Sequence, residues 1–301
     1  MRIETKKRLK VDYASVITEF EKAMKEFKVK KVLYKIVFRG RGLEFDGYRN
    51  FEPDDDASEI DWKSSLRMNK YLVKKYIEER NLNIYFVVDV SNGMLFGSGN
   101  KLKAERAGEV IAAMSHLSLG SDDMPSLVMF TDRVVKFVPP SKSINQFPLM
   151  IEFLSDANFY GGGFSFPFII DYLLKIIKSP YSVVIILSDF IHLHHDSEKL
   201  LRLLSAKFET IAVMVRDRMD ESIPKELDQI VLQDPYSERN LLVDPSIAAV
   251  RYNLIAKKQK QEVKDLLKRS NVDLLELNPD DSFVIPLVSF LSRRSGRKRV
   301  L

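Results

Sequence analysis

Residues 82–94, LNIYFVVDVSNGM, decide the fold that we predict for this chain of 301 residues. The run from Ile84 to Val90 is almost continuously apolar and rich in β-branched side chains, which is typical of a strand buried on both faces. Asp89 and Ser91 stand at the end of this run, and Gly93 follows them. The stretch therefore predicts a central strand of a mainly parallel sheet, with polar side chains at its carboxyl end.

Helical and strand patterns alternate from this stretch to the end of the chain. Buried strands that alternate with helices indicate an α/β fold of Rossmann-like type, in which helices cover both faces of the central sheet. We expect helices at 101–119, 144–154, 166–177, 197–207, 246–268 and 282–291, strands at 126–131, 134–138, 183–187, 210–215 and 272–277, and a small hairpin within 229–243.

Residues 1–80 are predicted to form an N-terminal α+β extension. A helical pattern covers 12–28, and strands are expected at 32–38 and 71–77, on either side of a segment rich in turn formers and carboxylates. We expect the large aromatic side chains of that segment to pack against the main domain; they are Tyr48, Phe51 and Trp62. The predicted organisation is thus an extension (1–80), an α/β domain (81–292) and a basic tail (293–301).

Composition excludes several classes of function. The chain has no cysteine, so disulfide frameworks, thiolate metal sites and cysteine nucleophiles are ruled out. No apolar run is long enough to span a membrane and no apolar signal segment follows the basic N-terminus, which predicts a cytoplasmic protein. The net charge of +5 is small, and much of it lies in Lys6–Lys10 and 293–301. Solvated termini explain these runs better than nucleic-acid binding, which stays an alternative.

Two predicted strands end in polar residues, as Asp89-Val90-Ser91 and Ser188-Asp189. Ligands of open parallel sheets collect beyond the carboxyl ends of the strands. Carboxylate and hydroxyl oxygens at such an edge suit Mg²⁺ or Mn²⁺, and a partner's carboxylate could complete the shell. The residues alone leave another interpretation open, in which Asp89 and Ser91 satisfy loop amides and cap the following helix.

Motifs in two parts of the chain resemble those of known families. DVSNGM after a buried strand, K-x-x-x-A-x-x-x-I in the next helix and LSDF after a later strand resemble a von Willebrand factor A (vWA) domain. Upstream, the segment EFDGYRNFEPDDDASEIDW is similar to the signature of the DUF58 family, E-F-x-x-Y-R-x-Y-x-P-G-D-D followed by I-D-W. Asp54 stands where that family often has glycine. The resemblance covers residues 39–215 and implies a vWA fold.

The resemblance also implies a metal-ion-dependent adhesion site, written D-x-S-x-S with a later threonine and a later aspartate. Asp89 and Ser91 match its first two ligands and Asp189 matches the last. Gly93 and Gly163 stand where hydroxyl ligands are expected. The site is therefore expected to be degenerate, binding Mg²⁺ or Mn²⁺ through three protein ligands or keeping its recognition role without an ion.

Family resemblance further implies a non-enzymatic adaptor that works with a MoxR-type AAA+ ATPase in protein remodelling or maturation. On this interpretation the chain presents an exposed edge with Asp89, Ser91 and Asp189 to a protein partner, and binds neither membrane nor nucleic acid. A second protein-binding surface is expected at four carboxylates, which are equally consistent with a solvated, helix-capping role; they are Asp54, Asp55, Asp56 and Asp61.

Enzymatic alternatives have weaker support in the residues. A Mg²⁺-dependent phosphohydrolase would use Asp89 as its nucleophile but would want a second carboxylate at Ser91. His192, His194 and His195 invite a zinc hypothesis, yet adjacent histidines cannot readily face one ion, so surface-loop histidines are favoured. Without a nucleophile–base pair or a nucleotide-binding loop, we assign no catalytic or cofactor-binding residue.

Overall fold

A six-stranded mixed sheet forms the centre of the computed structural model, which describes residues 9, 11–26, 44–52, 55, 57, 60–77, 81–226, 229–237 and 239–297. The strand order is β10-β7-β6-β3-β4-β5, and every neighbouring pair is parallel except β4–β5. The strands are β3 (Asn83–Asp89), β4 (Met124–Phe130), β5 (Val134–Val138), β6 (Ser182–Ser188), β7 (Glu209–Val215) and β10 (Asp273–Leu277). The predicted central strand is β3, between β4 and β6.

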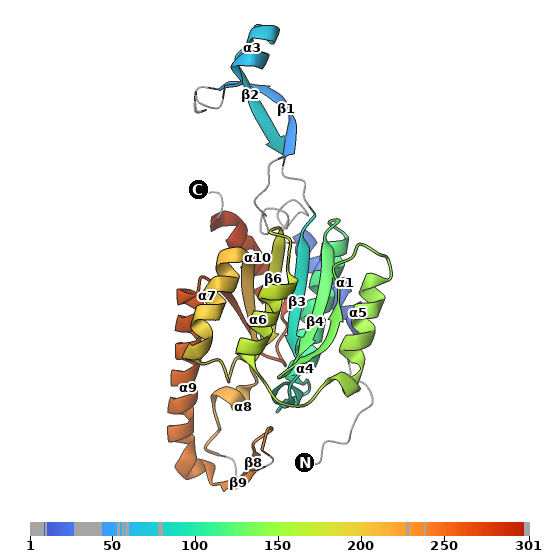
Figure 1. Ribbon diagram of the computed structural model, residues 1–301. Coiled ribbons are helices and arrows are strands. Elements are labelled where there is room, and N and C mark those ends of the chain that lie inside the picture. Colours follow the sequence, from blue (N-terminus) through green and yellow to red (C-terminus); the bar gives the residue numbers. More distant parts are fainter. Residues whose placement is uncertain are drawn as a thin grey trace.

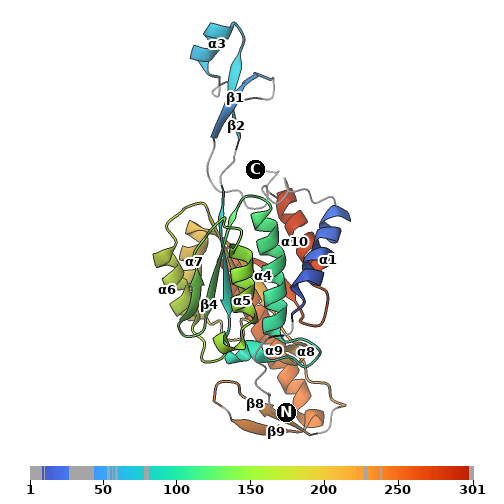
Figure 2. The same ribbon diagram turned by 90° about the vertical axis from the view of Figure 1, so that its right-hand side faces the viewer.

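Helices cover both faces of this sheet (Figures 1 and 2). One face carries α1 (Tyr13–Glu26), α4 (Lys103–Leu119), α5 (Gln146–Ser155) and α10 (Val284–Arg297). The other carries α6 (Phe166–Ile176), α7 (Glu198–Lys207) and α9 (Pro245–Arg269). Shorter elements are α8 (Arg218–Glu221), η2 (Asn92–Leu95), η3 (Ala157–Phe159), η4 (His195–Ser197) and the hairpin β8 (Ile230–Gln233) and β9 (Asn240–Val243). Each element predicted from residue 81 onward corresponds to one of these.

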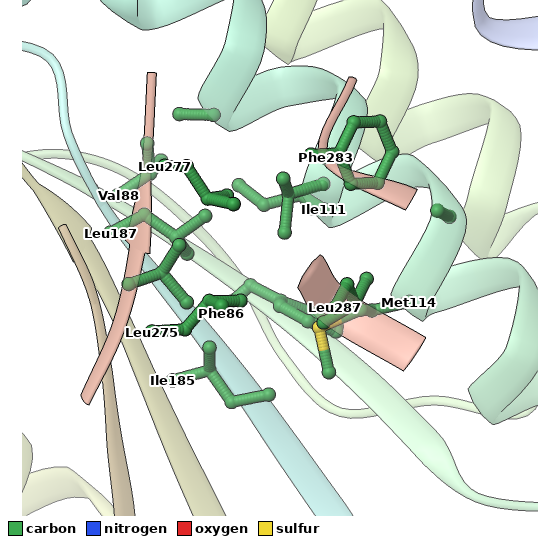
Figure 3. Packing of buried hydrophobic residues seen from close by; sticks show 14 of the residues in the cluster. Phe86, Val88, Ile111, Met114, Ile185, Leu187, Leu275, Leu277, Phe283 and Leu287 are labelled. Atoms are coloured by element: carbon green, nitrogen blue, oxygen red, sulfur yellow. The ribbon is translucent and has the colours of Figure 1, made fainter. Parts of the chain in front are cut away.

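Burial on both faces explains the continuous apolar run of β3. Successive side chains of a strand point to opposite faces of the sheet. Phe86 and Val88 belong to the hydrophobic cluster under α4 and α10, whereas Tyr85 and Val87 belong to the cluster under α6 and α7. Figure 3 shows Phe86 and Val88 packed with side chains of α4, β6, β10 and α10. The ends of β3 are thereby held in a fixed position, which matters for the polar residues that follow it.

A small arm extends beyond the end of the sheet at which β3 begins (Figures 1 and 2). It consists of the antiparallel strands β1 (Glu44–Asn50) and β2 (Leu72–Ile77) and the helix α3 (Trp62–Met68). The sequence predicted β2 but neither β1 nor α3, and the strand expected at 32–38 lies outside the described residues. Within the arm, Trp62 contacts Tyr71 edge to face, with ring centroids 6.2 Å apart.

The expected packing of aromatic residues against the main domain was wrong for two of them. The exposed fraction is 59% for Trp62 and 41% for Tyr48. The physical reason is that the arm is a two-stranded sheet with one short helix, which offers too little apolar surface to bury a large ring on every side.

Both ends of the described chain pack onto the sheet rather than outside it. Helix α1, which falls within the predicted extension, places Phe20 and Met24 in the same hydrophobic cluster as β3. Helix α10 continues through residue 297, and within it Arg294, 8% exposed, forms ion pairs with Glu209 and Asp273. The predicted basic tail therefore begins inside a packed helix. Within the described ranges, no helix combines the length and apolar character needed to cross a membrane.

Candidate functional site at the carboxyl edge of the sheet

Asp89 and Asp189 meet at the carboxyl edge of the sheet, as expected for residues that end neighbouring parallel strands. Asp89 is the last residue of β3, and Asp189 directly follows β6, which pairs with β3 in parallel register. Ser188 connects the two strand ends, because its hydroxyl donates a hydrogen bond of 2.7 Å to Asp89 Oδ2. The fold thus brings the predicted carboxylates together.

This edge is buried, so the exposure that we expected for it is wrong. The exposed fractions are 1% for Asp89, 0% for Ser91 and 5% for Asp189. Two groups from distant parts of the chain cover the three residues: the Lys103 side chain at the start of α4, and Tyr236 in the turn between β8 and β9. A partner cannot reach these side chains directly while both groups remain in place.

Asp89 already uses both of its oxygens within the protein. Oδ1 accepts a hydrogen bond of 2.9 Å from the backbone N–H of Ser91, and Oδ2 accepts the one from Ser188. The first bond satisfies a loop amide, as the alternative interpretation proposed. Ser91 does not cap the helix η2 with its side chain; its hydroxyl instead lies 3.0 Å from that of Tyr236.

The environment of Asp89 opposes its ionisation. Burial is the largest cause and the nearby Asp189 carboxylate is the second, and together they raise the pKa of Asp89 from 3.8 to about 7. The hydrogen bonds from Ser188 and Ser91 act in the opposite direction but are weaker. Around neutral pH, Asp89 is therefore near the midpoint of its titration.

Lys103 provides the positive charge at this edge. Its ammonium nitrogen lies 2.7 Å from Asp189 Oδ2 and 2.9 Å from Asp220 Oδ2, and the residue is 1% exposed. Burial by itself would lower the pKa of Lys103, but the two carboxylates outweigh it and raise that pKa. Burial would likewise raise the pKa of Asp189, which the Lys103 ammonium holds below its ordinary value. Asp189 and Lys103 thus form a fully ionised buried pair.

Sequence reasoning quoted Lys103 within a helix pattern but did not identify it as a site residue. A cation in the first turn of a helix faces the positive end of the helix dipole, which is unfavourable unless carboxylates lie nearby. A lysine at this position, directly after a loop and at the first residue of a helix, was the signal that could have identified it. Asp220 and Tyr236 carried no comparable signal in the sequence.

The turn between β8 and β9 closes the edge from the outside. The Tyr236 hydroxyl faces Ser91, and the Tyr236 ring contacts His192 edge to face at 5.0 Å. The Asn92 side chain donates a hydrogen bond of 2.8 Å to the carbonyl of Pro235. Burial, the largest cause, raises the pKa of Tyr236 to about 12, so its hydroxyl stays protonated at neutral pH.

Tyr236 also occupies the space that a ligand at position 93 would need. A Cβ atom built on Gly93 would lie 2.7 Å from the Tyr236 hydroxyl and 3.3 Å from Asp189 Oδ2. At Gly163, a Cβ would meet the Asp132 carboxylate at 3.3 Å. Both positions at which the adhesion-site pattern expects hydroxyls thus lack them, and at the first a tyrosine fills the place.

These residues do not fit the divalent ion that the family pattern implies. An ion bound between Asp89, Ser91 and Asp189 would lie against the Lys103 ammonium, and the like charges would repel each other. Asp189 Oδ1 accepts a hydrogen bond from the Ile191 backbone and Oδ2 is held by Lys103. We therefore derive no step that depends on a metal at this edge.

We expect Gly93→Ser to lower the free energy of unfolding by about 1–3 kcal/mol, because the new side chain forces Tyr236 out of its place. Adding Tyr236→Phe should restore part of this loss by removing the hydroxyl that clashes. The matched control is Gly163→Ser, where the exposed Asp132 side chain can move aside at a cost of about 0.5 kcal/mol or less. Urea unfolding followed by circular dichroism measures the stability of all three variants. Equal losses for Gly93→Ser and Gly163→Ser would contradict the assignment of Tyr236 as the group that fills the space beside position 93.

An open hollow of about 580 Å³ lies beside the buried site. Tyr236 belongs to both, since it lines the hollow and contacts Ser91. His192 and His194 also line it, but in the part of the chain that the structure describes, no three histidine or carboxylate side chains are grouped as metal ligands would be. The remaining lining residues are Gly163, Phe164, Ser165, Phe166, Pro167, Asp196 and Asp234.

The acidic segment of the arm lies far from this edge, at the opposite end of β3 (Figure 1). Asp54 and Asp56 are outside the described residues. Asp55 is bound by the Arg49 guanidinium, which holds the pKa of Asp55 at about 2. Asp61 caps α3 by accepting a hydrogen bond of 3.0 Å from the Ser64 backbone. The two described carboxylates thus have structural roles within the arm.

Comparison with known proteins finds one family whose model matches most of the chain. The model of the family described as "Protein of unknown function DUF58" matches residues 47–264. Uncharacterized proteins of Mycobacterium bovis and Mycobacterium tuberculosis are 25% identical over 263 residues, covering 85% of this chain and 81% of their own.

Two solved structures are similar to the chain to different degrees. BatB, a conserved hypothetical protein from Bacteroides thetaiotaomicron, superposes with a TM-score of 0.50 at 13% identity, covering 72% of this chain and 100% of its own. The VWA domain of SpRpn10 gives a TM-score of 0.36 at 11% identity, covering 71% of this chain and 95% of its own. The mostly parallel sheet with helices on both faces confirms the α/β fold predicted from the sequence.

Proposed function

Because the chain belongs to the DUF58 family, we propose that it is a non-enzymatic, protein-binding adaptor that works in the cytoplasm with a MoxR-type AAA+ ATPase. On this proposal it supports the remodelling or maturation of other proteins. It requires no divalent ion, since the Lys103 ammonium takes over the charge that an ion would supply at the edge of the sheet.

The buried ion pair between Lys103 and Asp189 is the observation that supports the proposal. An adhesion site uses its ion as a bridge to a partner's carboxylate and as a charge that holds its loops together. Here Lys103 connects the loops after β6 and β7, because it is bonded to both Asp189 and Asp220. The internal cation keeps the loop geometry and leaves partner binding to surfaces around the edge.

The same geometry disfavours the phosphohydrolase alternative. A nucleophilic carboxylate must be ionised and must reach the phosphorus atom of its substrate. Asp89 is 1% exposed, its pKa is raised to about 7, and both of its oxygens accept hydrogen bonds. Nucleic-acid binding has no support from Arg294, which is occupied by Glu209 and Asp273, while Lys6, Lys7, Arg8 and Lys10 lie outside the described residues.

Capture of the ATPase tests the proposal. We expect the tagged full chain to retain a MoxR-type ATPase of its own cell in the ATP-bound state, and to retain it less in the ADP-bound state. The unfolding temperature of the isolated chain should not change with Mg²⁺, with Mn²⁺ or with a chelator, because Lys103 already neutralises the site. Hydrolysis of para-nitrophenyl phosphate that Asp89→Asn abolishes would overturn the proposal. Failure to capture the ATPase in both the ATP-bound and the ADP-bound state would overturn it too.

A further inference from the structure

Besides Leu241, which is 64% exposed and points to the opposite face of β9 from its neighbour Leu242, six large apolar side chains lie exposed on the β8–β9 hairpin and the first half of α9. We refer to them as the apolar platform; with their exposed fractions they are Val231 (63%), Leu242 (63%), Ile247 (79%), Val250 (60%), Leu254 (69%) and Ile255 (57%). Val231 and Leu242 are cross-strand partners and therefore share one face of the hairpin. Exposed large apolar side chains that gather on neighbouring elements mark interaction sites.

The first half of α9 has the pattern of a helix that packs against another helix. The second half of α9 contributes Val263, Leu266 and Leu267 to the hydrophobic cluster on the sheet, whereas the first half buries only the small side chains of Pro245 and Ala249. The first half extends past the end of the sheet, next to the hairpin (Figures 1 and 2). Its exposed apolar residues Ile247, Val250 and Leu254 recur at steps of three and four, which places them on one face.

Three cations lie beside the apolar stripe of α9, and the exposed carboxylate at the start of that helix, Asp244, is engaged in capping it through Ser246. Arg251, Lys257 and Lys258 are exposed beside the apolar stripe of α9. Among the described residues, no carboxylate forms an ion pair with Arg251 or Lys257, whereas Lys258 has Glu262 at 3.8 Å. A second copy of the chain would bring the same cations against each other, which disfavours self-association. The rim instead complements a partner that carries carboxylates.

We propose that the apolar platform binds an acidic amphipathic helix of a partner protein. The apolar face of that helix would lie along Ile247, Val250 and Leu254, in the manner of helices that dock into apolar grooves. Carboxylates on its flanks would meet Arg251 and Lys257. The inference rests on the proposed adaptor function and identifies the surface and the chemistry through which it operates.

The absence of native cysteine permits a site-specific reporter in the full chain. An environment-sensitive fluorophore on Ile255→Cys, at the edge of the platform, reports docking, and the same fluorophore on Leu203→Cys of α7 is the control. The probe is a synthetic helical peptide with a leucine stripe flanked by glutamates. We expect saturable binding at Ile255→Cys alone, and binding weaker by about tenfold or more for a matched peptide with lysines in place of the glutamates.

Two test variants, each with a control on α7, locate the binding surface. Leu254→Asp should weaken binding of the glutamate peptide by about tenfold or more, without changing the unfolding temperature, because Leu254 is 69% exposed. Leu203→Asp, at a position 46% exposed on α7, should leave the affinity unchanged. Arg251→Glu combined with Lys257→Glu should reverse the preference in favour of the lysine peptide, and Lys199→Glu on α7 is its control.

Several results would overturn the inference: equal affinity for both peptides, equal effects of Leu254→Asp and Leu203→Asp, or a dimer in sedimentation that Leu254→Asp dissociates. The last result would identify a second copy as the occupant. Failure of the inference about the apolar platform is distinguishable from failure of the proposed function. ATPase capture that survives Leu254→Asp while the peptide does not bind refutes the platform alone, whereas peptide binding without ATPase capture refutes the proposed partnership alone.

Discussion

Lys103→Met is expected to lower the free energy of unfolding by about 3–5 kcal/mol, because it leaves Asp189 ionised and buried without its partner. The ammonium of Lys103 lies 2.7 Å from Asp189 and 2.9 Å from Asp220, in a site that is almost free of solvent contact. Urea unfolding at neutral pH measures the loss. An effect of this size is a large part of the stability of a typical domain.

Lys101→Met is the matched control for this prediction. Lys101 pairs with Glu109 at 2.5 Å, but its side chain is 36% exposed and Glu109 keeps a second partner in Arg106. We expect a loss of about 1 kcal/mol or less. Adding Asp189→Asn to Lys103→Met should recover part of the stability, since no unpaired charge then remains at position 189. Equal losses for the two lysine variants would show that the buried pair does not hold the loops together.

Asp89→Asn is expected to stabilise the protein above pH 7, by about 4 kcal/mol. The folded-state pKa of Asp89, about 7, lies above its ordinary value of 3.8, because burial and Asp189 oppose the charged form. Between these pH values the folded protein binds more protons than the unfolded chain, so its stability falls as the pH rises. A rise of the pKa from 3.8 to about 7 corresponds to a loss of about 4 kcal/mol once Asp89 is ionised, and asparagine avoids this loss.

The pH dependence distinguishes this effect from a general change in packing. The difference in unfolding free energy between Asp89→Asn and the natural chain should be near zero at pH 4, grow through pH 5 and 6, and level off above pH 7. Asp171→Asn is the control, because Asp171 pairs with Lys175 on an exposed helix surface and should give little change at any pH. A pH-independent difference, or destabilisation by Asp89→Asn at pH 8, would contradict the raised pKa.

The sequence predicted the central fold because its elements are defined by local patterns. Residues of β3 and β6 are buried on both faces of the sheet, which requires a continuous apolar run that can be recognised without knowing its neighbours. Strand β1 (Glu44–Asn50) has no such run. Its residues are largely polar, and it becomes a strand only by pairing with β2, so local pattern could not identify it.

Local patterns also explain why the sequence predicted only part of the site. Asp89 and Asp189 converge because they end parallel neighbours, and the alternation of helices with strands predicts a parallel sheet. Their burial depends on contacts between distant segments: Lys103 reaches Asp189 across 86 positions, and Tyr236 reaches Ser91 across 145. No local pattern specifies such contacts, and the turn that carries Tyr236 looks in the sequence like any other hairpin turn.

The β8–β9 hairpin contacts both the buried site and the solvent. Its tip holds Tyr236 against Ser91, and its strands display Val231 and Leu242 to solvent. Because Tyr236 and Pro235 of this turn contact Ser91 and Asn92, a displacement of the hairpin that breaks these contacts would withdraw the tyrosine ring from the strand ends. Water would then reach the carboxyl groups behind it and Asp89 would release its proton. Force applied at the outside of the hairpin is thereby converted into a change of charge at the end of the sheet.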